Sequence, residues 1–521
     1  MSTDALSSSG IVLFMVDQLS AKWLEAASAG VVPTPNLDRL RARGTTFTQC
    51  ITSNPVCQPT RSTLATGLTT RGHGVLENGY QLDPALPTFM RGLQKSGWRT
   101  AALGKVHLRP HFAGLHPDYR PYGFDLVHNT EDGRGGEWLD WVAERHPEHL
   151  DAVLSTIWAH SIPEFAAYGP DRADLRARIK SLRSKAAWAT PDLPEATPLY
   201  YALPFPDEVS QTSWITGHTL DFIEEVRAGR PFFAQVSYVQ PHSPSCPPGE
   251  YIGRVDAARI PTPAPAEWLR DPHAPGYFAG REPALPETWR PARQCYFADI
   301  AHLDHQLGRV LDALEQAGRL DQTSILFLSD HGDLLCDHGF LGKEERHYDA
   351  CIRVPLIIAG PGVERGQVRR ELVQLEDICP TILDMAGLSP EPMPRAGPYL
   401  EEPAGGIPVL PGRSLLPLCR GQQPPDWRGA AYCESYNSIV SAELGDWART
   451  IRTADFRYTF YAGGNGEQMF DLRSDPDEQA NVVADPAYAG TRQQLRDQLM
   501  DLIVLQDYPK TRRDLFALGV H

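Results

Sequence analysis

The stretch "IVLFMVDQ", residues 11–18, is a short apolar run that ends in a carboxylate, Asp17. Such a pattern is typical of a buried parallel strand whose C-terminal tip carries a functional residue. Two later stretches repeat the pattern, "PFFAQVSYVQPH" at residues 231–242 and "ILFLSDHGD" at residues 325–333. Helical patterns separate the strands, at residues 35–43, 61–66, 86–96, 216–228 and 296–317. The alternation predicts an α/β fold with a mostly parallel central sheet flanked by helices.

The polar residues at the ends of these strands are the first candidates for a site. In an open α/β sheet, ligands bind beyond the carboxyl ends of the strands. Four such residues, Asp17, His242, Asp330 and His331, follow the predicted strands directly. We therefore expect their side chains to converge at one edge of the sheet.

The overall composition excludes several classes of function. The chain has 521 residues, 42% of them hydrophobic, and a formal net charge of −16. This charge argues against nucleic acid or an anionic membrane as a partner. The opening "MSTDALSSSG" lacks the basic stretch of a signal peptide, and the apolar run after it is too short for a secretory signal or a membrane span. We expect a cytoplasmic protein.

Two stretches interrupt the alternation of strands and helices. Residues from about 109 to 206, with a helical piece at 171–187, are interpreted as a large insertion beside the sheet edge. Residues 388–412 are rich in proline and glycine and are interpreted as a linker. Short β-like runs at 430–436, 450–461 and 467–472 and a helix at 489–505 follow. We place a catalytic α/β domain at residues 1–421 and a small α+β domain with an antiparallel sheet at residues 422–521.

A second informative stretch is "NPVCQPTRSTLATG", residues 54–67, which contains Cys57. The chain has nine widely scattered cysteines and no C-x-x-C, which disfavours a disulfide framework or a structural zinc site. Cys57 lies at the start of a predicted helix, where free backbone N–H groups favour an anion. Arg61 lies one turn further on the same face. Cys57 is therefore either a buried thiol at a helix start or a reactive centre.

The motif C-x-P-x-R at Cys57 resembles the signature of the formylglycine-dependent sulfatases of the alkaline phosphatase superfamily. The stretch "GWRTAALGKVHL", residues 97–108, resembles the second sulfatase signature, with Lys105 and His107 in the usual positions. The stretch "MFDLRSDPDEQANV", residues 469–482, resembles the small C-terminal domain of that family. The remaining motifs follow the family's order: "VDQ" with Asp17, "QPH" with His242, "SDHGD" with Asp330 and His331, and "LGK" with Lys343.

The branch within this family is mixed. One part of the pattern resembles that of choline sulfatases and phosphonate monoester hydrolases, namely Asp17-Gln18, Asp330-His331 and Asn78. The second signature resembles that of sulfatases, because it keeps Lys105 and His107. Phosphonate monoester hydrolases have other residues at both positions. The mixture favours an aryl or alkyl sulfatase that also accepts phosphonate monoesters and phosphodiesters. The alternatives are a phosphonate monoester hydrolase or phosphodiesterase and, less favoured because no essential group is missing, a non-catalytic binding protein. Asn78 itself is either a turn former or a substrate ligand.

The resemblance also implies a mechanism. Cys57 would be oxidised to formylglycine by a formylglycine-generating enzyme, and the hydrated aldehyde would attack the sulfur of the ester. One divalent cation, Ca²⁺ or Mn²⁺, would assist this attack. Gln18 either adds an amide oxygen to the cation or only orients its neighbour. The implied ligands are Asp17, Asp330, His331 and residue 57, with Gln18 as the open case.

The other implied roles concern protons and charge. His242, helped by Lys343, would protonate the departing alcohol, and His107 would take the proton of the remaining hydroxyl. Arg61 and Lys105 would hold the hydrated aldehyde and the charge on the sulfate oxygens. Side chains implied in substrate binding are Asn78, Lys105, His242 and Lys343.

Five further residues lie near these motifs without a role that the resemblance assigns. They are His218, Asp333, Asp337, His338 and His347. We interpret His218 as structural. We expect Asp333 and His338 to contact the site residues without binding the ligand themselves. The long insertion and the tail at residues 508–521 also predict a homo-oligomer, a dimer or a tetramer.

Overall fold

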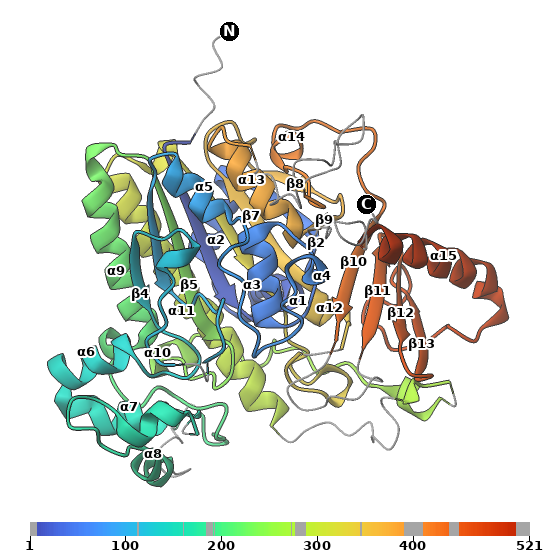
Figure 1. Ribbon diagram of the computed structural model, residues 1–521. Helices are drawn as coiled ribbons and strands as arrows, with labels where there is room; N and C mark the ends of the chain where they lie inside the picture. Colours follow the sequence, from blue (N-terminus) through green and yellow to red (C-terminus); the bar gives the residue numbers. More distant parts are fainter. Residues whose placement is uncertain are drawn as a thin grey trace, which may run out of the picture.

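The computed structural model describes residues 8–111, 114–159, 161–183, 191, 193–271, 273–276, 288–343, 346–389, 410–436 and 447–506. In this part of the chain, a central sheet has the strand order β4-β3-β5-β1-β6-β7-β2-β8, and β9 pairs with β2 (Figure 1). The strands are β1 Gly10–Asp17, β2 Gly44–Ile51, β3 Arg99–Gly104, β4 Leu126–Asn129, β5 Phe232–Pro241, β6 Thr323–Ser329, β7 Arg353–Ala359, β8 Gln367–Arg369 and β9 Val373–Gln374.

The sheet is mostly parallel, as the sequence predicts. Strand β1 pairs in parallel with β5 on one side and with β6 on the other. Val16 lies opposite Tyr238 of β5 and Ser329 of β6, so the three strands end at the same edge. Strand β7 is the exception, since it runs antiparallel to both β6 and β2.

Both faces of the sheet are covered by helices, which explains why β1 is a continuous apolar run rather than an alternating one. Val12, Phe14 and Val16 belong to one hydrophobic cluster, together with residues of α2, α9 and α11. Ile11 and Leu13 belong to a second cluster, on the other face, with residues of α3, α5 and α13. These helices are α2 Pro35–Arg43, α3 Cys57–Thr66, α5 Phe89–Lys95, α9 Gln211–Glu225, α11 Trp289–Gln316 and α13 Ile378–Met385.

Several helices begin earlier than their apolar patterns predict. Helix α3 begins at Cys57, before the predicted start at residue 61, and α11 begins at Trp289, before residue 296. Helix α9 begins at Gln211 because the side chain of Ser210 caps it by accepting from the backbone N–H of Ser213. The polar first turn of α9 lacks the apolar periodicity that marks the rest of the helix, although its cap fixes where it begins.

The C-terminal region forms a separate antiparallel sheet, as expected for a small α+β unit. Its strands are β10 Ala430–Ser435, β11 Ala448–Thr453, β12 Phe456–Tyr461 and β13 Gly466–Asp471, and helix α15 Ala489–Gln506 packs against it (Figure 1). The predicted run at residues 450–461 is two strands joined by a tight turn. Ala431, Cys433 and Phe470 share a hydrophobic cluster with Trp268 and Tyr348 of the larger unit.

The range interpreted as an insertion, residues 109–206, also supplies an edge strand of the central sheet. Strand β4 lies within it and pairs in parallel with β3. The helices after β4 lie together at the lower left of Figure 1: α6 Glu137–Arg145, α7 Leu150–Thr156 and α8 Arg176–Leu182. Helix α8 covers part of the predicted piece at 171–187, of which residues 184–187 lie outside the described residues. Most of the predicted linker, residues 390–409, also lies outside them.

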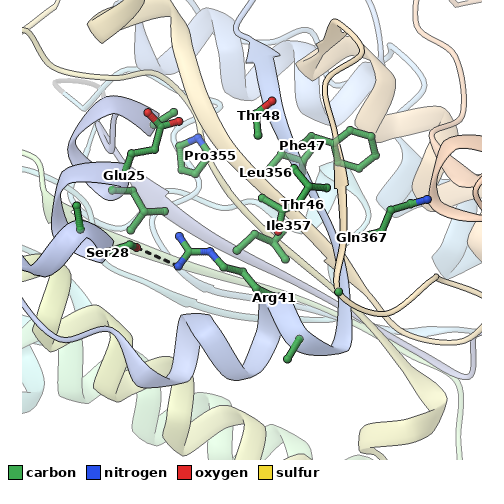
Figure 2. A pocket seen from close by; sticks show the side chains of 16 residues that line it. Glu25, Ser28, Arg41, Thr46, Phe47, Thr48, Pro355, Leu356, Ile357 and Gln367 are labelled. Atoms are coloured by element: carbon green, nitrogen blue, oxygen red, sulfur yellow. Dashed lines mark hydrogen bonds between the residues drawn. The ribbon is translucent and has the colours of Figure 1, made fainter.

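A pocket of about 550 Å³ opens between α1 Ala21–Ala26, α2 and strands β2, β7 and β8 (Figure 2). Its lining is mainly apolar and includes none of the residues predicted for the site. Its charged side chains already have partners. Glu25 pairs with Arg353 at 2.6 Å, and Arg41 donates to Ser28 at 3.0 Å and to Asp38 at 2.8 Å. Among the described helices, none has the length and apolar character needed to cross a bilayer.

Candidate active site

Four side chains with metal-ligand atoms converge at the carboxyl edge of the central sheet. Asp17 is the last residue of β1, and Asp330 directly follows β6, the parallel neighbour of β1. Cys57 is the first residue of α3, and His331 follows Asp330. One ligand atom of each residue lies within 4.8 Å of those of the others, and all four residues are buried. The structure thus brings together the four residues that the sequence predicts as ligands.

Arg61 joins the two carboxylates of this group. Its Nε donates to Oδ2 of Asp330 at 2.8 Å, and its Nη2 donates to Oδ2 of Asp17 at 3.4 Å. Its Nη1 donates to the carbonyl of Lys105 at 2.9 Å and to Oγ of Ser237 at 3.1 Å. Burial disfavours the charge, but Asp330 and Asp17 raise the pKa of Arg61 above its usual value. The guanidinium therefore fixes two predicted ligands in place, and its direct contact with substrate stays a prediction.

Two lysines bring positive charge to Cys57 and Asp17. The Nζ of Lys343 lies 2.7 Å from Sγ of Cys57. The Nζ of Lys105 contacts Oδ2 of Asp17 and lies 2.5 Å from Oδ1 of Asp132. Burial disfavours both ammonium charges, but the neighbouring acidic groups raise the pKa of both lysines. Both side chains therefore stay protonated at neutral pH and create a positive environment at the start of α3.

His331 is oriented as a metal ligand would be. Its Nδ1 donates to the carbonyl of Gly332 at 3.0 Å, so the lone pair of Nε2 faces Sγ of Cys57 at 3.1 Å and Oδ1 of Asp17 at 3.6 Å. Burial lowers the pKa of His331 to about 4, which keeps the ring neutral at neutral pH. A backbone carbonyl that fixes the tautomer of a histidine is a common support for a metal ligand. Two carboxylates and a neutral imidazole fit a divalent cation with a preference for oxygen and nitrogen ligands.

Gln18 directly follows the end of β1, and its side chain is held by Asp333. Its backbone N–H donates to Oδ1 of Asp330 at 3.0 Å, and its Nε2 donates to Oδ2 of Asp333 at 2.5 Å. Asp333 also accepts from the backbone N–H groups of Leu335 at 2.7 Å and Gly342 at 2.9 Å. Asp333 therefore contacts a predicted site residue, as expected, and fixes the direction of the Gln18 amide. Whether the amide oxygen binds a cation stays a prediction.

The two histidines predicted to move protons both lie next to this group. His107 is buried, and neither of its ring nitrogens has a hydrogen-bond partner among the described residues. Burial, followed by the neighbouring basic side chains of His111 and Lys105, lowers the pKa of His107 well below its usual value. His242 directly follows β5, and its Nδ1 donates to the carbonyl of Ser243 at 2.6 Å. This contact fixes the ring and leaves Nε2 to face the site.

Asn78 has a structural function in addition to its predicted one. Its Oδ1 accepts from the backbone N–H of Gln58 at 3.0 Å, in the first turn of α3. The Oε1 of Gln58 in turn accepts from the backbone N–H of Gly79 at 2.8 Å. This reciprocal pair caps the helix start one residue after Cys57 and so helps to fix where Cys57 lies. Asn78 also lies in a turn, which agrees with its interpretation as a turn former, and substrate binding stays a prediction.

The sequence interpretation missed two adjacent acids after β4. The Oε1 of Glu131 accepts from the backbone N–H groups of Val106 at 3.2 Å and His107 at 3.0 Å. The carboxylate of Asp132 contacts Lys105 and lies 3.5 Å from Nε2 of His111. The signal lies in "NTEDG", residues 129–133, where acids come shortly after a strand, as Asp330 comes after β6. The interpretation of residues 109–206 as an insertion hides this signal.

Four of the residues without an assigned role lie outside the group. Asp337 pairs with Lys22 at 2.7 Å and with Arg293 at 2.6 Å. His338 bonds the carbonyl of Pro265 at 3.2 Å, so among the described residues its expected hydrogen bond to the site is not found. The ring of His347 bonds Ser435 at 3.0 Å and Thr450 at 2.7 Å. The ring of His218 stacks on that of His128 at 3.8 Å, which agrees with the structural interpretation of His218.

Comparisons with known proteins agree with this geometry. The family model described as Sulfatase matches residues 9–147 and 159–388, and the model described as N-sulphoglucosamine sulphohydrolase, C-terminal, matches residues 336–504. The chain is 27% identical to an arylsulfatase of Clostridium perfringens, covering 92% of this chain and 91% of that one. It is 28% identical to a choline-sulfatase of Rhizobium meliloti, covering 91% and 82%. The crystal structure of the phosphonate monoester hydrolase of Agrobacterium radiobacter superposes with a TM-score of 0.74 at 26% identity, covering 95% and 96%.

The fold is alkaline phosphatase-like, and the chain is similar to hydrolases that share this fold. The chain belongs to the sulfatase family, because the family model matches well over half of its length. It is a sulfuric ester hydrolase, and the predictions of family, fold class and enzyme class are confirmed.

Arg61→Ala should destabilise the metal-depleted protein by about 3–5 kcal/mol, because it leaves Asp17 and Asp330 buried without their shared cation. Denaturant unfolding of the two proteins measures the difference. Arg39→Ala is the control, since Arg39 pairs at the surface with Asp312 and Glu315 and should contribute at most about 1 kcal/mol. Equal losses in the two variants would contradict the central role of Arg61.

Proposed function

We propose that the protein hydrolyses aryl or alkyl sulfate monoesters with a formylglycine derived from Cys57 and one divalent cation. The observation that carries this proposal is the environment of Cys57. Its Sγ lies 3.1 Å from Nε2 of His331, 2.7 Å from Nζ of Lys343 and 3.8 Å from Oδ1 of Asp17. A buried thiol at a helix start would not need two ligand-type side chains and a cation around it. The same position is where a nucleophile bound to a cation would have to lie.

Two groups that the chain does not itself encode would supply part of the chemistry. Formylglycine at position 57 is hydrated in water to a geminal diol and so supplies an oxygen nucleophile. A divalent cation held by Asp17, Asp330 and His331, with Gln18 as a further candidate, supplies positive charge at the sulfate oxygens. The buried carboxylates and the neutral imidazole that would hold this cation are already oriented by Arg61 and Gly332.

The side chains around this position provide charge and proton transfer. Lys105 and Lys343 carry protonated ammonium groups toward the place of the sulfate oxygens, where negative charge is concentrated in the transition state. His242 is the candidate acid for the departing alcohol, and its Nδ1 contact with Ser243 leaves Nε2 to deliver the proton. His107 is the candidate base for the remaining hydroxyl, because its lowered pKa keeps it neutral and its ring nitrogens have no hydrogen-bond partner in the described part of the chain.

The alternative is a phosphonate monoester hydrolase or phosphodiesterase. It is favoured by Asp330-His331 and by the likeness to the solved phosphonate monoester hydrolase. Such esters carry a single negative charge, as sulfate monoesters do, so the same site can accept both. Lys105 and His107 support the sulfatase, and every group needed for catalysis is present, which disfavours a non-catalytic binding protein.

Cys57 should contain formylglycine when the protein is produced together with a formylglycine-generating enzyme. Peptide mass spectrometry of an active preparation should show the aldehyde at residue 57, and the thiol at Cys50 serves as an internal control because it is buried in β2. Cys57→Ala should lower the turnover rate by several powers of ten, because the nucleophile is lost. A fully active preparation that contained only the thiol at residue 57 would contradict the mechanism.

Chelation should remove one divalent ion per chain and abolish turnover, and added Mn²⁺ or Ca²⁺ should restore both. Metal analysis after dialysis should show that His331→Ala binds the ion far more weakly, because an oriented nitrogen ligand is lost. His273→Ala, which changes an exposed histidine, is the control and should retain the ion. Turnover that withstands exhaustive chelation would exclude the proposed role of the cation.

The rank order of substrates separates the two enzyme activities. With aldehyde-bearing enzyme, kcat/KM should be highest for para-nitrophenyl sulfate or an alkyl sulfate, lower for a phenylphosphonate monoester and a phosphodiester, and lowest for para-nitrophenyl phosphate. The reason is that the cluster of Arg61, Lys105 and Lys343 matches a single negative charge. If phosphonate monoesters were turned over much faster than every sulfate ester, the phosphonate monoester hydrolase would be the correct assignment.

Other features of the proposal rest on the sequence. The maturation enzyme as partner and the homo-oligomer, a dimer or a tetramer, stay predictions. The tail at residues 508–521, one of the two reasons for the oligomer, lies outside the described residues. The choice between Ca²⁺ and Mn²⁺, the cytoplasmic compartment and the division at residue 421 also stay predictions.

A further inference from the structure

Asp132 is a buried carboxylate at the site that neither the motifs nor the predicted ligand set includes. It follows the edge strand β4, and its side chain is 8% exposed. Its Oδ1 lies 2.5 Å from Nζ of Lys105. Its Oδ2 lies 3.5 Å from Nε2 of His111 and 3.9 Å from Nε2 of His242. The carboxylate thus contacts one predicted substrate-binding cation and faces the predicted acid.

The backbone of Asp132 has a contact of its own, separate from those of the carboxylate. The indole Nε1 of Trp158 donates to its carbonyl at 2.9 Å. The adjacent acid, Glu131, holds the surrounding chain: its Oε1 accepts from Tyr119 and Asn129 at 2.9 Å, in addition to two backbone N–H groups. The two neighbouring acids therefore differ. Glu131 accepts from backbone and neutral donors. By contrast, all the described contacts of the Asp132 carboxylate are with basic side chains.

Lys105 is shared between two carboxylates with different positions. On one side it contacts Asp17, whose charge a bound divalent cation would also compensate. On the other side it contacts Asp132, which lies outside the group of ligand atoms around Cys57. The charge of Asp132 is therefore not needed to bind the cation. It reduces the positive charge available to the substrate by one unit.

We infer that Asp132 sets the charge selectivity of the site, by disfavouring dianionic phosphate monoesters relative to monoanionic sulfate esters while it positions Lys105. This inference rests on the proposed function. A phosphate monoester at neutral pH carries one more negative charge than a sulfate monoester of the same alcohol. In a poorly solvated site the repulsion of this extra charge by a carboxylate one side chain away amounts to a factor of about ten or more. Asp132 is a positioning and selectivity residue and need not touch the substrate.

The test is the ratio of kcat/KM for para-nitrophenyl sulfate to kcat/KM for para-nitrophenyl phosphate, measured on the same preparation. The ratio is independent of the fraction of enzyme that is folded and matured. In Asp132→Asn it should fall by about tenfold or more, and Asp132→Glu should restore much of it. The ratio of sulfate to phenylphosphonate monoester should change by much less, because both substrates are monoanions. Asp118→Asn is the matched control, since Asp118 is exposed and pairs only with Arg120 among its described contacts.

The outcomes distinguish this inference from the proposed function. Wild-type enzyme that hydrolysed no sulfate ester would overturn the proposed function, whatever Asp132 does. Active wild-type enzyme with an unchanged sulfate-to-phosphate ratio in Asp132→Asn would overturn only the inference. Asp132→Ser is the second variant. If both variants were folded by near-ultraviolet circular dichroism but inactive on all three substrates, Asp132 would be required for turnover in general and the inference would also fail.

Discussion

The bridge from Arg61 to Asp17 and Asp330 is the interaction on which the rest of the site depends. Two carboxylates buried at adjacent strand ends repel each other and lose their hydration, which a protein tolerates only with a well-placed cation. Arginine suits this task because its planar guanidinium donates in several fixed directions. Here those donors also reach the carbonyl of Lys105 and the hydroxyl of Ser237, so one side chain contacts residues in β1 and β5 and residues directly after β3 and β6.

The same bridge determines where Cys57 lies. Arg61 is four residues after Cys57 in α3, so the pull of the carboxylates on Arg61 brings the first turn of the helix to the sheet edge. Asn78 caps that turn from outside, and Lys343 approaches the sulfur from a separate loop. The spacing C-x-P-x-R is thus a geometric requirement. One helical turn places Cys57 beside the carboxylates and the arginine between them.

The elements that carry short-range patterns were predictable from the sequence, and those that depend on distant partners were not. The strands β1, β5 and β6 and the residues at their ends follow from apolar runs that stop at polar residues. The edge strand β4 has only four residues, half-buried for the most part, so nothing distinguishes it from a loop until β3 pairs with it. The range that contains β4 is therefore interpreted as an insertion, and the acids that come after the strand are not assigned to the site. The several contacts of Arg61 depend on the packing of four strands and cannot be read from its position in the sequence.

The whole chain is negatively charged, whereas an anionic substrate needs positive charge at the site. This difference explains why the site is buried. With a net charge of −16, the protein repels an anionic substrate at long range. Attraction must then come from a few cations at short range, and it is strong only where water is excluded. Lys105 and Arg61 are almost inaccessible to solvent, as this argument requires. Burial of so much positive charge is in turn possible only because Asp17, Asp330 and Asp132 compensate it. The acids are therefore what allows the cations to be present, and the balance between the two sets how much negative charge the site accepts.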